Sequence, residues 1–367
     1  MTATRRSFLK AGIATAAAAA TLETHTIGQA PEPPDFSGFS IDTLVNDGPG
    51  FNVQQAIDAG LTACVVDLAI YPRNYSNALR AVAEWDIAFK REKRFVKATC
   101  FSELQRAKKE RKFGVVLACQ DASILDTSTL SVNGQNIDNL EFFYDLGLRV
   151  LQMTHNEANP LGDSFREKRN AGLSWLGEKV VAAMNSLGML VDLSHCGKKT
   201  TLEAIALSKQ PCAITHTGCQ ALCPTARNKS DEEIRALADK GGVIGVFNMS
   251  QWLTQAPKTS IDDVIGHIDH IVNIAGIDHV SFGSDGPVLK SDVPESIELR
   301  GLQSYVERNA GMPGAEWMPK HAHVEELNSP NRLLRLAEAL SKRGYKAESV
   351  EKIVGGNFVR LFHDVCG

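Results

Sequence analysis

The chain has 367 residues, of which 43% are hydrophobic and 22% are charged. This composition is ordinary for a globular protein, and the length suits a single α/β barrel of about 250 residues or more. The formal net charge of −4 gives no electrostatic reason to expect a nucleic-acid partner. Eight cysteines are scattered without a C-x-x-C pair, which disfavours a zinc site made of thiolates.

The N-terminus carries a targeting pattern. Arg5 and Arg6 precede a mild, alanine-rich run from Ala11 to Leu22. That run is too short and too weakly apolar to span a bilayer, so we expect no transmembrane segment. The pattern resembles a twin-arginine export signal, with cleavage near Ala30. We therefore predict that residues 1–30 are a signal segment, that residues 31–367 form one domain, and that the protein is periplasmic or secreted.

From Phe39 onward, short apolar runs alternate with stretches of helical periodicity. Residues 63–68, ACVVDL, are apolar almost throughout, as in a strand that is buried on both faces. Further apolar runs lie at 39–41, 113–119, 148–154, 189–193, 212–215, 242–247 and 279–283. Helical patterns separate most of them, and strand and helix alternate about eight times. This alternation predicts an α/β fold, a (β/α)8 TIM barrel.

The regular alternation stops after the last of these runs. Residues 287–330 contain several Gly, Pro and polar residues and show little periodicity. A loop of this length in a compact domain is usually functional, and it follows a strand end, so we expect it to cover the barrel mouth like a lid. Helical patterns return at 331–341, 347–354 and 357–365, with a break at Gly355-Gly356.

The stretch from Met189 to Thr217 gives the first functional clue. Two apolar runs here are each followed or ended by a histidine, His195 and His216, with a helical pattern between them. In a parallel barrel the C-terminal ends of the strands face one shared mouth, where the chemistry collects. Imidazole is the commonest metal ligand in proteins, so the pair suggests a metal site. The alternative is two histidines that are hydrogen-bonded at their strand ends.

Taken together, ordered stretches along the chain resemble the membrane (renal) dipeptidase family of the amidohydrolase superfamily. They read LGLRVLQMTHNEANPLGD at 146–163, LGMLVDLSH at 187–195, ITH at 214–216, RNKSD at 227–231, GGVIG at 241–245, DHVSFGSD at 278–285 and GGNF at 355–358. The resemblance implies a barrel of the metal-dependent hydrolase type that hydrolyses dipeptides with zinc. Members often form dimers, so a second copy of this chain is a candidate partner.

The resemblance also implies roles for particular residues. His195 and His216 match two metal-binding histidines, and Asp285 matches the aspartate that completes the metal cluster. His155 matches the histidine that polarises the scissile carbonyl, and Arg227 the arginine that holds the carboxylate of the substrate. As a catalytic residue, Asp285 could instead take a proton from water and return it to the leaving amine.

Three of the six metal-binding side chains of the family are replaced. Leu44 and Asn46 stand where the family has a His-x-Asp pair, and Gln120 stands at the metal-bridging glutamate. Leucine cannot bind a metal, and a neutral amide is a poor bridge. Asp47 and Asp67 could take over as ligands, although nothing in their spacing requires it.

Two functions remain open. The first is a periplasmic hydrolase with one zinc ion rather than two, held by His195, His216, Gln120 and Asp285, that cleaves dipeptides or a related small amide. The second is a non-hydrolytic family member that binds or tailors an exported peptide metabolite. Both take a small peptide in the barrel mouth. Arg227 and His155 fit both functions, and the lost ligands at Leu44 and Asn46 favour the second, but we favour the hydrolase and keep the second function as the alternative.

Overall fold

The computed structural model describes residues 37–68, 72–126, 137–256, 258–290 and 322–367, with a few single residues between 297 and 307. The predicted signal segment and most of the predicted lid therefore lie outside the described residues. The remainder belongs to one compact unit, Phe36–Gly367.

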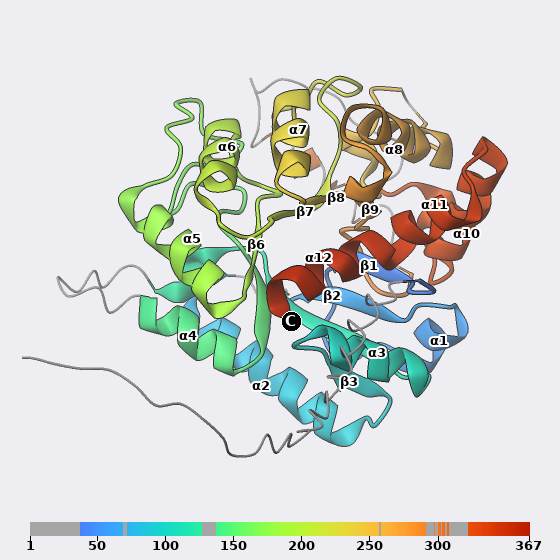
Figure 1. Cartoon of the computed structure of the whole chain (residues 1–367), viewed down its shortest axis with the longest axis horizontal. Coiled ribbons are helices and arrows are strands. Elements are labelled where there is room, and N and C mark those ends of the chain that lie inside the picture. The colour runs from blue at the N-terminus through green and yellow to red at the C-terminus, as the bar shows by residue number, and fades with distance from the viewer. Residues whose placement is uncertain are drawn as a thin grey trace, which may run out of the picture. The chain divides into compact units, whose positions relative to one another are not determined.

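Eight parallel strands form the barrel, and helices surround them (Figure 1). In spatial order they are β1 (Ile41–Val45), β2 (Ala63–Asp67), β4 (Phe113–Cys119), β5 (Leu148–Gln152), β6 (Leu190–Asp192), β7 (Ala213–Thr217), β8 (Val243–Val246) and β9 (Val280–Phe282). Backbone hydrogen bonds close the ring between the first and last strands: the Asp285 amide donates to the Leu44 carbonyl at 3.0 Å, and the Asn46 amide to the Gly286 carbonyl at 2.9 Å. The predicted (β/α)8 barrel is confirmed.

Two details of the strands differ from the prediction. The first strand is Ile41–Val45 rather than 39–41, because Asp42 and Thr43 are buried inside the barrel with polar partners and do not interrupt it. A ninth strand, β3 (Phe95–Lys97), pairs only with the first half of β4. Its three residues are too few to give a period-two signal in the sequence.

A helix follows most strands, and side-chain caps mark several helix starts. The helices are α1 (Val53–Asp58), α2 (Tyr75–Arg91), α3 (Phe101–Lys109), α4 (Asp138–Asp145), α5 (Trp175–Leu187), α6 (Lys198–Leu207), α7 (Asp231–Asp239) and α8 (Ile261–Ala275). Short 3-10 turns are η1 (Ala122–Leu125), η3 (Ser250–Trp252), η4 (Ile277–His279) and η5 (Glu325–Leu327). Ser174 caps α5, and Ser230 with Glu233 forms the predicted capping box of α7.

The chain ends in α10 (Arg332–Arg343), α11 (Ala347–Glu351), the π turn η6 (Lys352–Gly356) and α12 (Asn357–Cys366). The predicted break falls at Gly355, where the backbone leaves helical geometry. A Cβ on Gly355 would lie 2.5 Å from the carbonyl oxygen of Phe39, so only glycine allows the chain to pass this close to the start of β1.

Helix α12 closes the N-terminal end of the barrel, and it crosses the strands in Figure 1. Phe358, Val359 and Phe362 of α12 form one buried apolar cluster with the first residues of several strands, among them Ile41 and Ala63. A second, larger cluster fills the layer between strands and outer helices. Because one end of the barrel is filled in this way, the functional side chains lie at the other end.

Candidate active site

The C-terminal ends of the strands bring the predicted residues together. Asn46 follows β1, Gln120 follows β4, His155 and His195 lie three residues beyond β5 and β6, His216 is in β7, and Asp285 lies three residues beyond β9. A cavity of about 320 Å³ at this end is lined by Asn46, Asp67, Arg73, Gln120, His155, Asn156, His195, Met249, Trp252 and Asp285. Of the predicted site residues, His216 and Arg227 are not among the lining residues.

A buried carboxylate fixes the ends of β6 and β7 and thereby the two histidines. Asp192 accepts hydrogen bonds from the backbone and hydroxyl of Ser194, at 3.1 and 2.5 Å, and from those of Thr215, at 3.1 and 2.7 Å. His195 directly follows Ser194, and His216 directly follows Thr215. The Nε2 atoms of the two histidines lie 2.9 Å apart.

The outer nitrogens of the two rings also have partners. His195 Nδ1 lies 3.0 Å from Asn156 Oδ1, and His216 Nδ1 lies 2.9 Å from Thr215 Oγ1. Burial, and next the positive charge of Arg227, lowers the pKa of both rings well below the usual value. Both imidazoles are therefore neutral at pH 7.

His155 stacks on His195, with ring centroids 4.4 Å apart and planes 22° apart. Burial, followed by the charge of Arg73, lowers the pKa of His155 well below its usual value. A neutral imidazole has one N–H to donate to a substrate oxygen, so the predicted role of His155 at a carbonyl is chemically available.

Asn46 and Gln120, which the resemblance places at metal-ligand positions of the family, form a chain of hydrogen bonds with Asp285 and Asp67. Asn46 Nδ2 donates to the side chain of Asp285 at 2.7 Å and to its carbonyl at 3.0 Å. Gln120 Nε2 donates to Asn46 Oδ1 at 2.7 Å and to Asp67 Oδ2 at 3.2 Å. The side chain of Leu44 instead packs in the apolar cluster against α12 and offers no ligand.

Arg73 is the cation that lines the cavity. Its guanidinium forms an ion pair with Asp67 at 2.5 Å, and the two side chains are 6% and 0% exposed. Asp67 also accepts a hydrogen bond from the backbone amide of Gln120 at 2.9 Å. The sequence analysis did not predict Arg73 as a site residue. Arg73 follows the C-terminal end of β2, and this position could have indicated that it lies at the barrel mouth.

Asp285 adopts a left-handed backbone conformation, with φ of 55°. Burial, which outweighs the opposing effects of Arg227 and Asn46, raises its pKa to about 6. A carboxyl group with this pKa exchanges a proton near neutral pH, as an acid–base catalyst must. Arg332, which the sequence did not single out, fixes the adjoining backbone: it donates to Ser284 Oγ at 2.7 Å and to Asp42 at 3.1 Å.

Arg227 is buried, with 1% of its surface exposed to solvent. Its terminal nitrogens donate to the carbonyls of Ser194 at 2.7 Å and His216 at 3.0 Å. Its guanidinium carbon lies 5.4 Å from the ring centres of Phe247 and Trp252. These contacts tie it to the backbone that carries the histidines. Its predicted role at the carboxylate of a substrate stays a prediction.

The donors at this end of the barrel do not fit a two-metal centre. Among the residues that the structure describes, no group of three or more His, Cys, Asp or Glu side chains could hold a metal ion. Two imidazole nitrogens on one tetrahedral zinc would lie about 3.4 Å apart. His195 Nε2 and His216 Nε2 lie 2.9 Å apart, which is shorter than that separation.

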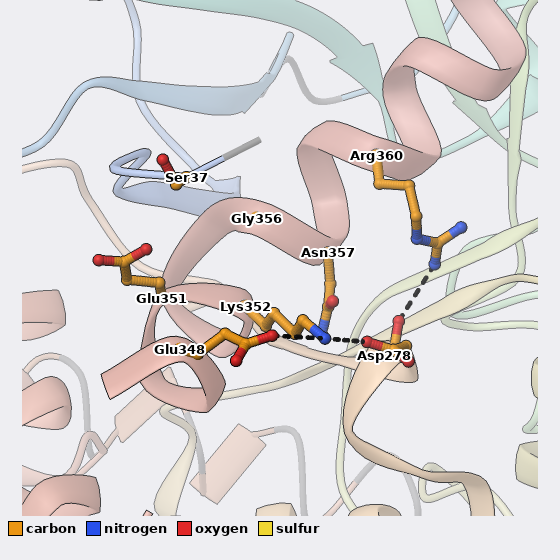
Figure 2. Close-up of a pocket in the computed structure, with 8 residues that line it drawn as sticks. All are labelled: Ser37, Asp278, Glu348, Glu351, Lys352, Gly356, Asn357 and Arg360. Atoms are coloured by element: carbon orange, nitrogen blue, oxygen red, sulfur yellow. Dashed lines mark hydrogen bonds and ion pairs between the residues drawn. The ribbon is translucent and has the colours of Figure 1, made fainter. Parts of the chain in front are cut away.

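A second cavity, of about 360 Å³, lies at the opposite end of the barrel (Figure 2). Lys352 Nζ lies 2.9 Å from Asp278 and 3.6 Å from Glu348 there, and Arg360 donates to the backbone carbonyl of Asp278 at 3.1 Å. None of the predicted site residues lines it. We therefore place the candidate active site at the C-terminal end of the barrel.

A (β/α)8 barrel with imidazoles, a buried acid and an arginine at the C-terminal mouth has the architecture of a barrel enzyme. Residues 56–293 match the membrane dipeptidase family, peptidase family M19. The chain belongs to this family, as the sequence resemblance predicted. M19 is a metallopeptidase family, which implies a metal.

Individual relatives agree with this assignment. Dipeptidase tcpJ of Claviceps purpurea is 29% identical over 248 residues, which cover 66% of this chain and 51% of that protein. The chain thus spans about half the length of the curated relatives it matches. An amidohydrolase from Pseudomonas aeruginosa is similar with a TM-score of 0.77 and 26% identity, over 89% of this chain and 96% of that one.

A more distant structure shares the fold. It is a metallopeptidase from Rhodobacter sphaeroides, liganded with a phosphinate mimic of the dipeptide L-Ala-D-Ala, with a TM-score of 0.70 and 17% identity, over 90% of this chain and 99% of that one. In the part of our chain that the structure describes, no helix is both long and apolar enough to cross a membrane.

Proposed function

We propose that the protein acts on a dipeptide or a related small amide in the cavity at the barrel mouth. The supporting observation is that this cavity brings together the guanidinium of Arg73, the imidazoles of His155 and His195, and the carboxyl of Asp285. A guanidinium suits a carboxylate, and a buried acid of raised pKa suits proton transfer near neutral pH. We propose that the reaction is hydrolysis. In it, Asp285 takes a proton from the attacking water and returns it to the leaving amine, and His155 donates a hydrogen bond to the carbonyl oxygen.

The cellular setting and the metal are further parts of the proposal. Arg5 and Arg6 support export by the twin-arginine route to the periplasm or the medium. For the metal, we propose at most one zinc ion per chain, at His195 and His216, because Asn46, Gln120 and Asp285 are committed to one another. No chemical step is assigned to that ion.

A second function, binding or tailoring of a peptide without hydrolysis, has its own support. The hydrogen-bonded chain from Asp67 through Gln120 and Asn46 to Asp285 lies where the family resemblance implies metal ligands. Direct hydrogen bonds link the members of this chain, so it needs no ion to hold it together.

Incubation of the purified protein with L-Ala-D-Ala, with and without added zinc, separates these functions. The distant structural relative with a mimic of this dipeptide makes it a reasonable first probe. Release of free alanine by the native chain, and its loss in Asp285→Asn, is the result that we expect. Binding by calorimetry without any release of alanine, with or without zinc, would reject hydrolysis and favour the second function.

A further inference from the structure

The amide of Gln120 has a defined orientation, although glutamine oxygen and nitrogen are easily interchanged in assignment. The carbonyl oxygen of Asp285 can only accept, so the group of Asn46 that lies 3.0 Å from it is the donor, Nδ2. Asn46 Oδ1 therefore faces Gln120 and accepts from its Nε2 at 2.7 Å. Asp67 Oδ2, at 3.2 Å, requires a donor at the same position.

This orientation leaves Gln120 Oε1 as an acceptor that no described residue satisfies. Gln120 is 3% exposed, and its Oε1 atom is buried without a hydrogen-bond partner among the described residues. Several other buried side-chain oxygens among the described residues also lack a hydrogen-bond partner. Of the described residues that carry such an oxygen, Gln120 is the one that lines the cavity at the mouth. Buried polar atoms are normally satisfied, so a partner that enters the cavity is expected.

The charges around Gln120 favour a hydrogen-bond donor over a metal ion as that partner. The neighbouring carboxylate, Asp67, is already neutralised by Arg73 at 2.5 Å. Both members of this pair line the cavity, and together they add no net negative charge that would attract a metal ion. A neutral amide oxygen without a free carboxylate beside it is a weak site for zinc, which prefers nitrogen, sulfur and carboxylate ligands.

We propose that Gln120 is a substrate-binding residue, whose Oε1 accepts a hydrogen bond from an N–H group of a dipeptide or small amide. The inference rests on the proposed function, since it takes the same ligand class into the same cavity. The N–H group is either the terminal amine or the amide nitrogen of the ligand. Gln120 thus serves recognition at a position where the family resemblance implies a bridging metal ligand.

Three ligands test the proposal on the unmodified protein. They are L-Ala-D-Ala, propanoyl-D-alanine, which lacks the amine, and L-alanyl-D-lactate, which has an ester oxygen in place of the amide N–H. Dissociation constants come from calorimetry, and mass spectrometry of the recovered ligand separates binding from turnover. We expect one of the two analogues to bind about 5- to 50-fold more weakly than L-Ala-D-Ala, which identifies the N–H group.

The variant Gln120→Met removes the acceptor and should weaken L-Ala-D-Ala binding by a similar factor, with no further loss for the analogue that already lacks the donor. Gln251→Met is the matched control, because Gln251 is also a buried amide whose Oε1 has no hydrogen-bond partner among the residues that the structure describes, but it does not line the cavity. Thermal melting checks that both variants fold. If Gln120→Met does not fold, the ligand series on the native chain decides alone.

Each other outcome has a clear meaning. Equal affinity for all three ligands, or equal losses for all three in Gln120→Met, overturns the role of Gln120 and leaves the proposed function standing. A metal ion found by elemental analysis in the native chain and lost in Gln120→Met also overturns it. If the native chain binds none of the three ligands, the proposed function itself fails, and the role of Gln120 fails with it.

Discussion

The guanidinium of Arg73 lies 2.5 Å from the carboxylate of Asp67, and both side chains are almost fully buried. An ion pair at this depth is costly to break, because the remaining charge loses both its partner and its water. The same pair removes Asp67 from the set of carboxylates available to a metal. At this side of the mouth, the positive charge of Arg73 therefore balances the negative charge of Asp67.

Arg73→Ala should destabilise the protein by about 3–5 kcal/mol, because it leaves the Asp67 carboxylate buried without its cation. Urea unfolding measures the change. The control is Arg94→Ala: Arg94 and Glu92 are also 2.5 Å apart but are 44% and 30% exposed, so the loss of this pair should cost much less stability than the loss of the buried one. Equal losses in the two variants would contradict this account.

The metal content should not exceed one zinc ion per chain after dialysis, and His216→Ala should release whatever zinc is bound. The reason is that His195 and His216 face one another while the other candidate ligands are engaged elsewhere. Elemental analysis measures the number of zinc ions per chain in the native protein and in the variant. His279→Ala serves as control, since His279 Nδ1 lies 2.8 Å from the carbonyl of Gly242 and takes no part in the site. Two zinc ions in the native chain would refute the prediction.

Gln120→Glu should raise metal affinity above that of the native chain. A carboxylate at this position adds a negative charge, can bridge two cations, and no longer donates to Asp67. The measurement is zinc content at a fixed free zinc concentration. Leu44 still offers no ligand, so two-metal activity need not follow. A zinc content equal to that of the native chain would contradict this prediction.

Export depends on the first residues if the twin-arginine prediction is right. Replacement of both Arg5 and Arg6 by lysine should keep the protein in the cytoplasm, because the positive charge is kept while the paired arginines are lost. Fractionation and immunoblotting of cells that produce either form provide the comparison. A periplasmic yield equal to that of the native chain would disprove the prediction.

The barrel was predictable because its strands are buried on both faces and read as apolar runs, as in residues 63–68. The meeting of His195 and His216 followed from one rule, that strand ends share a mouth, whereas Gln120 and Asp285 entered the predicted site through the family resemblance. The pairing of Arg73 with Asp67 could not be predicted, because both residues are common in loops and no spacing rule joins them. The sequence left open whether His195 and His216 bind a metal or are hydrogen-bonded at their strand ends, because the 2.9 Å between their Nε2 atoms depends on side-chain positions that no spacing rule gives.

The pH dependence of stability provides a test of the environment of Asp285. Burial raises its pKa from 3.8 to about 6, so the unfolded chain releases this proton at a lower pH than the folded chain. The contribution of the group to stability is therefore complete below about pH 4 and is lost as the pH rises through about 6. The loss reaches about 3 kcal/mol at pH 7 and stays constant above it.

Asp285→Asn removes this titration and keeps the shape of the side chain, and asparagine tolerates the left-handed backbone that Asp285 adopts. The difference in unfolding free energy between the variant and the native chain should be constant below about pH 4. It should then rise in favour of the variant by up to about 3 kcal/mol between pH 4 and pH 7. Urea unfolding of both proteins from pH 3 to pH 8, in chelator-treated buffer, measures that difference, and contributions from other groups cancel. A difference that is flat across this range would show that Asp285 titrates as an ordinary carboxyl group. It would also remove the physical basis for its proposed role in proton transfer near neutral pH.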